Sequence, residues 1–147
     1  MLSTVKEFMT KLSATFYQDD SLQQCLQTFV EKEMDGAMVL NSLDELVGVL
    51  TIKDPLKGAF FQKKTVGEVM TVPGVILHED DRIDSVIHYR DEIHPVKDSN
   101  DKLTGYITRR QLFEGYSELN QEKLSLMDAI FNISRKKSPT SRNVKVR

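Results

Sequence analysis

An internal repeat constrains the fold of this chain more than any other feature of its sequence. The segment Val5–Thr10 (VKEFMT) recurs 61 residues later as Val66–Thr71 (VGEVMT). At the same offset Ala14–Leu22 aligns with Val75–Ile83, and each is a short apolar run closed by an acidic pair. Such a duplication indicates two copies of one supersecondary unit that bury their apolar faces against each other.

Each copy has the pattern strand, helix, strand, strand, helix. Apolar residues at helical spacing predict a helix from Ser21 to about Glu33, with Asp20 or Ser21 as its N-cap. Its counterpart begins near Ile83 and must be shorter, because the offset between the copies falls to 57 residues beyond it. The other strands are expected at residues 37–40, 46–51, 94–97 and 103–108, and the last helices at 55–61 and 112–119.

These elements predict an α/β fold of the α+β type, in which a pseudo-twofold axis relates the two repeats. A unit of about 60 residues with one apolar face is marginally stable alone, so the two sheets should pack together. We place the first repeat at residues 4–62, the second at 63–119, a C-terminal linker helix at 120–133 and a basic flexible tail at 134–147.

The tail differs in composition from the rest of the chain. From residue 134 onward there are six Lys or Arg residues and no Asp or Glu. This is typical of a solvated segment after a folded domain, although contact with nucleic acid or an acidic membrane surface stays open as an alternative. The body lacks the clustered Lys and Arg that phosphate contacts require, so we expect no direct nucleic-acid binding by the folded part.

Length and composition are those of one globular domain, with 147 residues of which 39% are hydrophobic and 29% charged. No run approaches the roughly 18 to 20 apolar residues of a membrane span, and the N-terminus has no signal-peptide pattern. We therefore expect a cytoplasmic protein without membrane contact. The single cysteine, Cys25, lies in the apolar pattern of the first helix, which favours a place in the core over a reactive thiol.

The sequence signatures of catalysis are missing. The chain has no Gly-rich phosphate loop, no Gly-x-Ser-x-Gly elbow and no His-Glu-x-x-His helix. His78 and His88 have no metal-ligand spacing with each other or with Cys25. The acidic pairs at 19–20 and 80–81 recur at matching strand-to-helix boundaries, which favours capping over hydrolysis. We therefore expect neither an enzyme nor a metal site.

The later part of each repeat resembles the CBS domain family. Repeats of that family combine a Pro-Val-x-Asp segment with Leu-x-Gly-hydrophobic-hydrophobic-Ser/Thr-x-x-Asp before the second helix. The chain has Pro95–Asp98 followed by Leu103–Gln111 in the second repeat, and Leu46–Asp54 in the first. The Val-x-x-Met-Thr motif that opens each repeat is also similar. The resemblance covers about residues 4–119 and implies a tandem pair, also known as a Bateman module.

CBS pairs typically act as regulatory modules that bind AMP, ADP, ATP or S-adenosylmethionine in the cleft between the repeats. The resemblance therefore implies a ligand sensor that signals to a partner and requires no cofactor, and paired apolar faces predict a homodimer. Leu124–Ile133 resembles the helix that follows the CBS pair in bacterial enhancer-binding transcription regulators, which implies a C-terminal effector domain. The alternative is a structural dimerisation domain with an empty, degenerate cleft.

The resemblance implies ligand contacts where the last strand of each repeat ends. In the first repeat, the Asp54 carboxylate would accept hydrogen bonds from ribose hydroxyls. Thr51 and Lys53 would reach a phosphate at the helix N-terminus. The alternative interpretation of Asp54, which precedes Pro55, is an ordinary N-cap before a first-turn proline.

The second repeat departs from the family pattern. Thr108 keeps the hydroxyl, but Gln111 stands where the family has the acid, so hydrogen bonds to ribose lose charge assistance. Arg109 and Arg110 add cations for phosphate, or else are exposed arginines at a helix start. We expect the first site to bind ribose better than the second.

The resemblance also implies contacts with the adenine base from the segments before the first strand of each repeat, residues 12–16 and 73–77, and from one later residue in each repeat. The residues concerned are Thr15, Phe16, Ala37, Ile76 and His94. His94 directly precedes Pro95, and its alternative interpretation is a packed or solvent-facing histidine.

Overall fold

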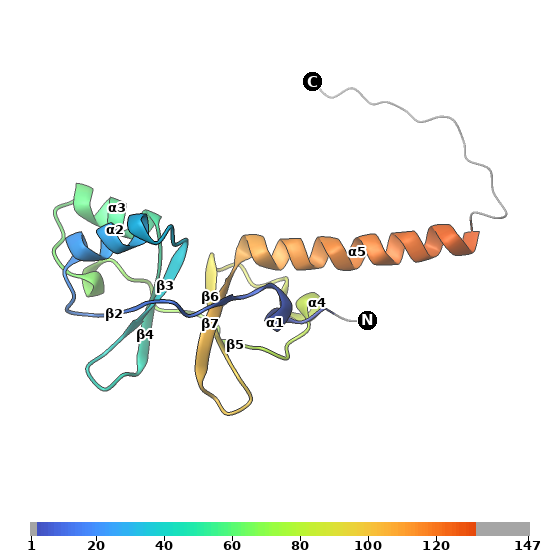
Figure 1. Cartoon of the computed structure of the whole chain (residues 1–147), viewed down its shortest axis with the longest axis horizontal. Helices are drawn as coiled ribbons and strands as arrows, with labels where there is room; N and C mark the ends of the chain where they lie inside the picture. The colour runs from blue at the N-terminus through green and yellow to red at the C-terminus, as the bar shows by residue number, and fades with distance from the viewer. Residues whose placement is uncertain (1–2, 132–147) are drawn as a thin grey trace, which may run out of the picture.

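The structure is a computed structural model that describes residues 3–131, the side chains of 122–124 and 131 excepted. Figure 1 shows two small sheets side by side, with a long helix that projects away from the second of them. The predicted tail at 134–147 and the last two residues of the predicted linker helix lie outside the described residues.

The first sheet has three strands in the order β2-β3-β4, with β2 parallel and β4 antiparallel to the central strand. Two helices accompany this sheet, and together these elements follow the predicted order of a repeat. They are β2 (Thr15–Tyr17), α2 (Leu22–Glu31), β3 (Gly36–Leu40), β4 (Leu46–Thr51) and α3 (Lys53–Phe60).

The second sheet has four strands in the order β1-β7-β6-β5. Three of these strands and two helices repeat the order of the first half, which confirms the predicted fold class. They are β5 (Leu77–His78), α4 (Ile83–Val86), β6 (Ile93–Lys97), β7 (Leu103–Thr108) and α5 (Arg109–Phe131). The predicted shortening of the first helix is also confirmed, since α4 has 4 residues and α2 has 10.

The segments that open the two repeats cross over between the sheets. The first one, α1 (Val5–Phe8) and β1 (Thr10–Lys11), opens the first repeat in sequence but lies against the second half, where β1 pairs with the edge of β7. The second one contains the 3-10 helix η1 (Val66–Glu68) and lies against the first half. Its Thr71 pairs with Val49 of β4 as Thr10 pairs with Tyr106 of β7. The crossing of the first segment is visible in Figure 1.

Two glycines make room for these crossing segments. Gly48 and Gly105 occupy matching positions in β4 and β7. A Cβ atom at Gly48 would collide with the Met70 side chain, and one at Gly105 would collide with the backbone oxygen of Thr10. The repeated Val-x-x-Met-Thr and Leu-x-Gly motifs are therefore packing partners, because the Met-Thr residues of one motif pack directly against the glycine of the other.

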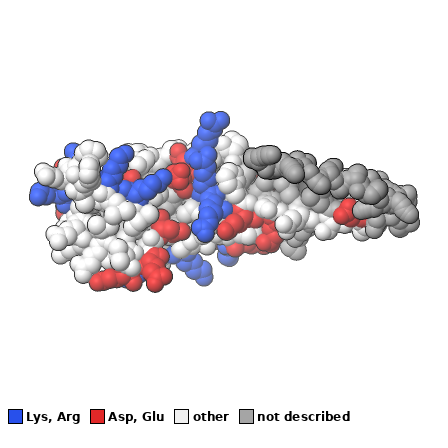
Figure 2. Space-filling model, turned by 90° about the horizontal axis from the view of Figure 1, so that it is seen from above, with Lys and Arg blue, Asp and Glu red and all other residues white. Residues whose placement is uncertain are grey.

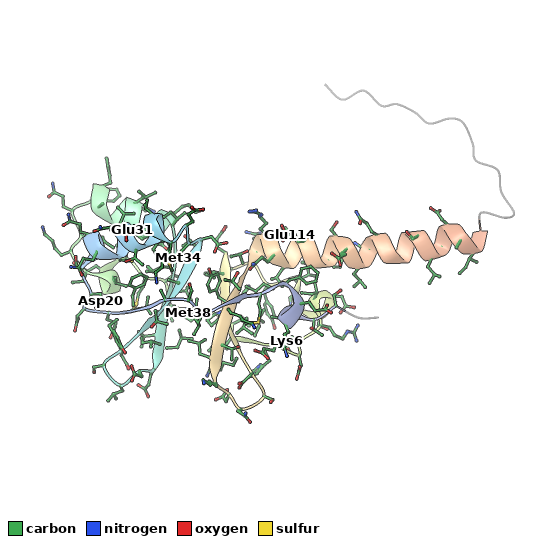
Figure 3. All side chains as sticks on the ribbon, in the orientation of Figure 1. Lys6, Asp20, Glu31, Met34, Met38 and Glu114 are labelled. Atoms are coloured by element: carbon green, nitrogen blue, oxygen red, sulfur yellow. The ribbon has the colours of Figure 1, made fainter. Side chains whose placement is uncertain are left out.

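Three apolar clusters hold the molecule together. Each half has its own core beneath its helices, and the third cluster joins the two sheets through β3 and β4 on one side and β6 and β7 on the other. This third cluster consists of Met38, Val49, Ile93 and Tyr106. Figure 3 shows Met38 in the space between the two sheets. The expectation that the two sheets pack together is therefore confirmed.

Cys25 lies in the core of the first half and is 1% exposed. Burial, with a smaller contribution from Asp20, raises the pKa of its thiol to about 12. The thiol is therefore protonated at neutral pH, and the prediction of a core cysteine is confirmed.

Local hydrogen bonds explain where the helices begin. Ser21 is the N-cap of α2, and its side chain accepts a hydrogen bond from the backbone of Gln24 at 3.3 Å. The second residues of the acidic pairs close the preceding turns, since Asp20 accepts from the Tyr17 backbone at 2.8 Å and Asp81 from the His78 backbone at 2.9 Å. The pairs therefore stabilise strand-to-helix turns, and Ser21 is the helix cap.

The predicted linker helix is present as far as residue 131, but it is not a separate element. The last helix of the second repeat continues without a break into the expected linker, so that α5 has 23 residues. Its first turns pack on the second core through Leu112, whereas Leu126, Met127 and Ile130 near its end are exposed. Among the described residues, no helix is long and apolar enough to span a membrane.

Candidate ligand cleft between the repeats

A cavity of about 450 Å³ opens between the two halves of the molecule. This volume lies in the range of small-molecule sites. The cavity is bounded by the end of β4, the first turn of α3, the connection after η1 and the loop that leads into β6. Its lining residues are Val49, Thr51, Lys53, Asp54, Lys57, Thr71, Val72, Pro73, Arg90, Asp91, Glu92 and Ile93.

The turn from β4 into α3 positions the central polar group of the cavity. Asp54 reaches back to the end of the strand, where its Oδ2 accepts a hydrogen bond from the Thr51 backbone at 2.8 Å. The Thr51 hydroxyl lies 3.4 Å from the same oxygen. Among the described residues, no hydrogen bond reaches the other carboxylate oxygen of Asp54. The turn is thus fixed through one oxygen, while the second keeps its capacity to accept hydrogen bonds.

The interpretation of Asp54 as an N-cap was wrong. The helix begins at Lys53 and its N-cap is Ile52, so Asp54 lies inside the first turn and Pro55 follows it there. An acidic residue in the first turn still has a favourable interaction with the helix dipole. The structural role of Asp54 is to hold the Thr51 backbone, and this role is compatible with ligand contact.

Charges of both signs surround the cavity. Lys53, Lys57 and Arg90 supply cations, and Asp91 and Glu92 face them from the loop before β6. Figure 2 shows basic and acidic side chains interspersed across the middle of the molecule in the view from above. The site therefore offers cations for a phosphate and carboxylates for hydroxyl or amino groups within the same cleft.

The second repeat uses the same turn with different chemistry. Gln111 Oε1 accepts from the Thr108 backbone at 2.9 Å, as Asp54 does from Thr51. The amide nitrogen of Gln111 donates to the hydroxyl of Thr10 at 2.9 Å. Both polar atoms of the Gln111 side chain are therefore engaged within the protein, which agrees with the expectation that the two sites differ.

The two predicted arginines lie away from the cavity lining. Arg109 contacts the loop of the first cleft, since its backbone donates to the Glu92 carbonyl at 2.9 Å and its guanidinium lies 3.7 Å from the Glu92 carboxylate. Arg110 is exposed and lies 3.7 Å from Glu114. Figure 3 labels Glu114 near the start of α5. Arg109 is thus linked to the cleft through Glu92, while Arg110 faces outward.

The residues predicted to contact a base do not line the cavity. Ala37 and His94 are completely buried at matching positions of β3 and β6, and Phe16 stacks on Phe29 in the first core. Thr15 is exposed on β2, and Ile76 is 37% exposed. Their role as ligand contacts stays a prediction, and for His94 the buried position matches the alternative of a packed histidine.

His94 is an unusual member of the second core. Among the described residues, neither of its ring nitrogens makes a hydrogen bond of good geometry, although the Val75 backbone lies near the ring. Burial lowers the pKa of its imidazole, and the Val75 backbone and the Asp91 carboxylate offset this effect only in part. The ring of Tyr89 lies 6.0 Å from the His94 ring. The folded protein therefore holds His94 in its neutral form.

Sequence reasoning missed several lining residues of the cavity. Thr71 ends the repeated Met-Thr motif, so the duplication itself carried a signal for it. Lys57 lies one helical turn beyond Lys53 and faces the same cleft. Residues 90–92 belong to the loop after the shortened helix, and no motif marks them.

The family of the chain follows from comparison with known proteins. Residues 5–59 match the CBS domain family, and the solved structures most similar to the chain include several CBS pairs. By this match the chain contains a CBS domain at residues 5–59, and as a whole it has the fold of a tandem CBS pair.

Two curated relatives are longer proteins that the chain matches over part of their length. L-aspartate semialdehyde sulfurtransferase of Methanocaldococcus jannaschii is 24% identical over 115 residues, which is 76% of this chain and 23% of the relative. Inosine-5'-monophosphate dehydrogenase of Nitrosopumilus maritimus is 31% identical over 112 residues, which is 71% of this chain and 22% of the relative. The chain thus spans about a quarter of the length of these relatives.

Three solved structures share the fold. CBSX2 of Arabidopsis thaliana, solved with AMP, has 24% identity and a TM-score of 0.63 over 80% of this chain and 98% of its own. The CBS pair of protein MJ0100, solved with 5-methylthioadenosine and S-adenosylmethionine, has 24% identity and a TM-score of 0.65 over 84% and 99%. The CBS domain of a bacterial CNNM/CorC family Mg²⁺ transporter, solved with ATP, has 21% identity and a TM-score of 0.64 over 77% and 86%.

Proposed function

We propose that this chain is a regulatory module that binds an adenosyl compound in the cleft between its repeats. The observation that carries the proposal is the cavity of about 450 Å³ with Thr51, Lys53 and Asp54 on its wall. The free oxygen of Asp54 is the acceptor for ribose hydroxyls. Lys53 and Lys57 are the groups that would receive phosphate. The proposed function is binding and signalling, without catalysis.

The solved complexes support the choice of ligand class. AMP, 5-methylthioadenosine, S-adenosylmethionine and ATP are the compounds bound to proteins with this fold. All four contain adenine joined to ribose, the adenosyl part, and they differ in what the 5' carbon carries. We therefore propose the adenosyl part as the common part of the ligand, with AMP, ADP, ATP and S-adenosylmethionine as the compounds to distinguish.

A thermal-shift panel tests this proposal. The purified chain is heated with AMP, ADP, ATP or S-adenosylmethionine, and with GMP as a control for phosphate binding alone. A ligand that binds only the folded state raises Tm, and the shift corresponds to about 2.7 kcal/mol at 100 times Kd. A rise with at least one adenosyl compound and none with GMP is expected. No shift with any compound at millimolar concentration would contradict the proposal.

Asp54→Asn is the sharpest variant for the site. An amide oxygen at the matching position, in Gln111, already holds the Thr108 backbone, so the variant keeps the turn. It loses the charge of the carboxylate toward ribose, and we expect Kd for the adenosyl ligand to rise about tenfold. Isothermal titration calorimetry gives the value.

Asp81→Asn is the matched control. Asp81 also accepts from the backbone three residues before it, at 2.9 Å, but it lies at the strand-to-helix turn of the second repeat. This control should bind as the wild type does. Equal affinities for Asp54→Asn and wild type would remove Asp54 from the ligand site.

We infer that the signal leaves the module through α5. The first turn of α5 holds the cavity loop through Arg109 and Glu92, and the same helix extends to the exposed side chains of Leu126, Met127 and Ile130. A ligand that moves Glu92 therefore acts on the start of a helix whose far end has free apolar surface. A homodimer, or an effector domain after α5 in a longer protein, would receive the signal there.

Light scattering with and without the adenosyl ligand tests this second part of the proposal. A change in the association of the chain, lost in a variant with Met127→Glu and Ile130→Glu, is the expected result. If the wild type and the double variant showed the same association with and without ligand, the role of α5 would be contradicted. It would leave ligand binding to be judged by calorimetry.

A further inference from the structure

The pseudo-twofold axis gives the open cavity a counterpart in the other half of the molecule. Four lining positions of the cavity can be matched through the repeat. Val49, Asp54, Thr71 and Glu92 of the first cleft correspond to Tyr106, Gln111, Thr10 and Asp35 of the second. Backbone pairing supports the correspondence, because Thr10 lies opposite Tyr106 as Thr71 lies opposite Val49.

The matching residues of the second cleft are bonded to one another. The Tyr106 hydroxyl donates to Asp35 Oδ1 at 2.7 Å, and Gln111 donates to the Thr10 hydroxyl at 2.9 Å. Tyr106 is 5% exposed, so its ring occupies the space between the sheets. In the first cleft the same positions face a cavity, and Val49 provides no ring to fill it.

The surroundings of the tyrosine show that its hydroxyl is held firmly. Burial, followed by the hydrogen bond to Asp35, raises the pKa of Tyr106 far above its usual value, while Thr10 and the Gly36 backbone act in the opposite direction. The hydroxyl therefore stays protonated and continues to donate to Asp35. Because Asp35 precedes β3 and Tyr106 belongs to β7, this hydrogen bond also ties the two halves together.

We propose that Tyr106 fills the second cleft in place of a ligand, so that one chain binds one adenosyl ligand. The aromatic ring takes the space of the base, Asp35 receives the Tyr106 hydroxyl, and the Thr10 and Gln111 side chains satisfy each other. Tyr106 is thereby the residue that sets the number of ligands. This inference rests on the proposed function, because it presupposes that the first cleft binds an adenosyl compound.

Isothermal titration calorimetry with AMP, and in parallel with S-adenosylmethionine, measures the number of sites. The wild type should bind one equivalent per chain. Tyr106→Val with Gln111→Asp gives the second cleft the residues of the first at these two positions, and this double variant should bind two equivalents. Tyr106→Phe is the control, because it keeps the ring and loses only the hydroxyl, so it should still bind one.

The reverse exchange tests the same idea in the first cleft. Val49→Tyr places a ring where Val49 now lies, with Glu92 at the position that matches Asp35. We expect its affinity for AMP to fall at least 100-fold while its circular dichroism spectrum stays that of the wild type. If Val49→Tyr does not fold, the number of equivalents bound by the double variant decides the question alone.

The outcomes separate this inference from the proposed function. Two equivalents for the wild type, or one equivalent for a folded double variant, would overturn the role of Tyr106. Both results would leave ligand binding intact. No binding of either compound by the wild type would instead contradict the proposed function.

Discussion

The two clefts of this molecule share a backbone and differ in what their side chains do. In both turns a side-chain oxygen accepts a hydrogen bond from the backbone N–H of a threonine, and this oxygen belongs to Asp54 in one turn and to Gln111 in the other. One turn then borders a cavity, whereas the other is sealed by Tyr106 and Asp35. The comparison teaches that the shared positions of the CBS motif specify the turn, while the residue after the motif glycine, Val49 in one half and Tyr106 in the other, decides whether the cleft is open.

The two motif glycines provide the strongest test of the equivalence of the halves. In Gly105→Ala the new methyl group meets the Thr10 backbone, which is fixed by the pairing of β1 with β7. In Gly48→Ala it meets the Met70 side chain, which has rotatable bonds and can move aside. We expect losses of unfolding free energy of about 3 kcal/mol and about 1 kcal/mol respectively. Urea unfolding measures both, and equal losses would contradict this difference between the halves.

A second difference concerns the matching core positions Ala37 and His94. The folded state holds His94 neutral with a lowered pKa, so the unfolded state binds the additional proton as the pH falls. The free energy of unfolding should be at its full value above the ordinary pKa of 6.5. At lower pH it should decrease by up to about 1.4 kcal/mol per pH unit. In His94→Ala, which copies the first repeat, this loss should disappear. Urea midpoints at three pH values from 7.5 to 5.5, for both proteins, check the prediction, and parallel pH profiles would contradict it.

The starts of α2 and α4 provide the smallest contrast. Ser21 caps α2 through the Gln24 backbone, whereas α4 begins after Arg82 without a side-chain cap. Ser21→Ala should lower the unfolding free energy by about 1 kcal/mol. Arg82→Ala should leave the urea midpoint nearly unchanged. If Arg82→Ala lowered the free energy of unfolding as much as Ser21→Ala, the difference in capping between the two helices would be contradicted.

Much of the fold could be predicted because it depends on local patterns. Strands β4 and β7 have the predicted bounds, since each ends at a Thr-x-x-Asp or Thr-x-x-Gln turn whose residues are close in sequence. The continuity of α5 was missed because the apolar residues after 119 were assigned to a second helix. Neither proline nor glycine separates the two segments.

The site was predictable only in part, for a physical reason. Thr51, Lys53 and Asp54 belong to one turn and could be found from their spacing. The state of the second cleft depends on a hydrogen bond between residues 71 positions apart in sequence, Asp35 and Tyr106. The exchange of acid for amide at Gln111 predicted that the halves differ. It gave no sign that Tyr106 of the same motif closes the cleft through its hydrogen bond to the distant Asp35.

The crossing of α1 and β1 to the second sheet has a consequence for the synthesis of the protein. Thr10 pairs with Tyr106, so β1 leaves the ribosome long before β7 and has no strand partner until β7 follows it. The closing of so long a loop is slow and comes late in folding. A nascent chain therefore carries β1 unpaired until the segment up to β7 has been made. A copy that lost its first twelve residues would expose the edge of β7, and such an edge is a template on which another chain can add a strand.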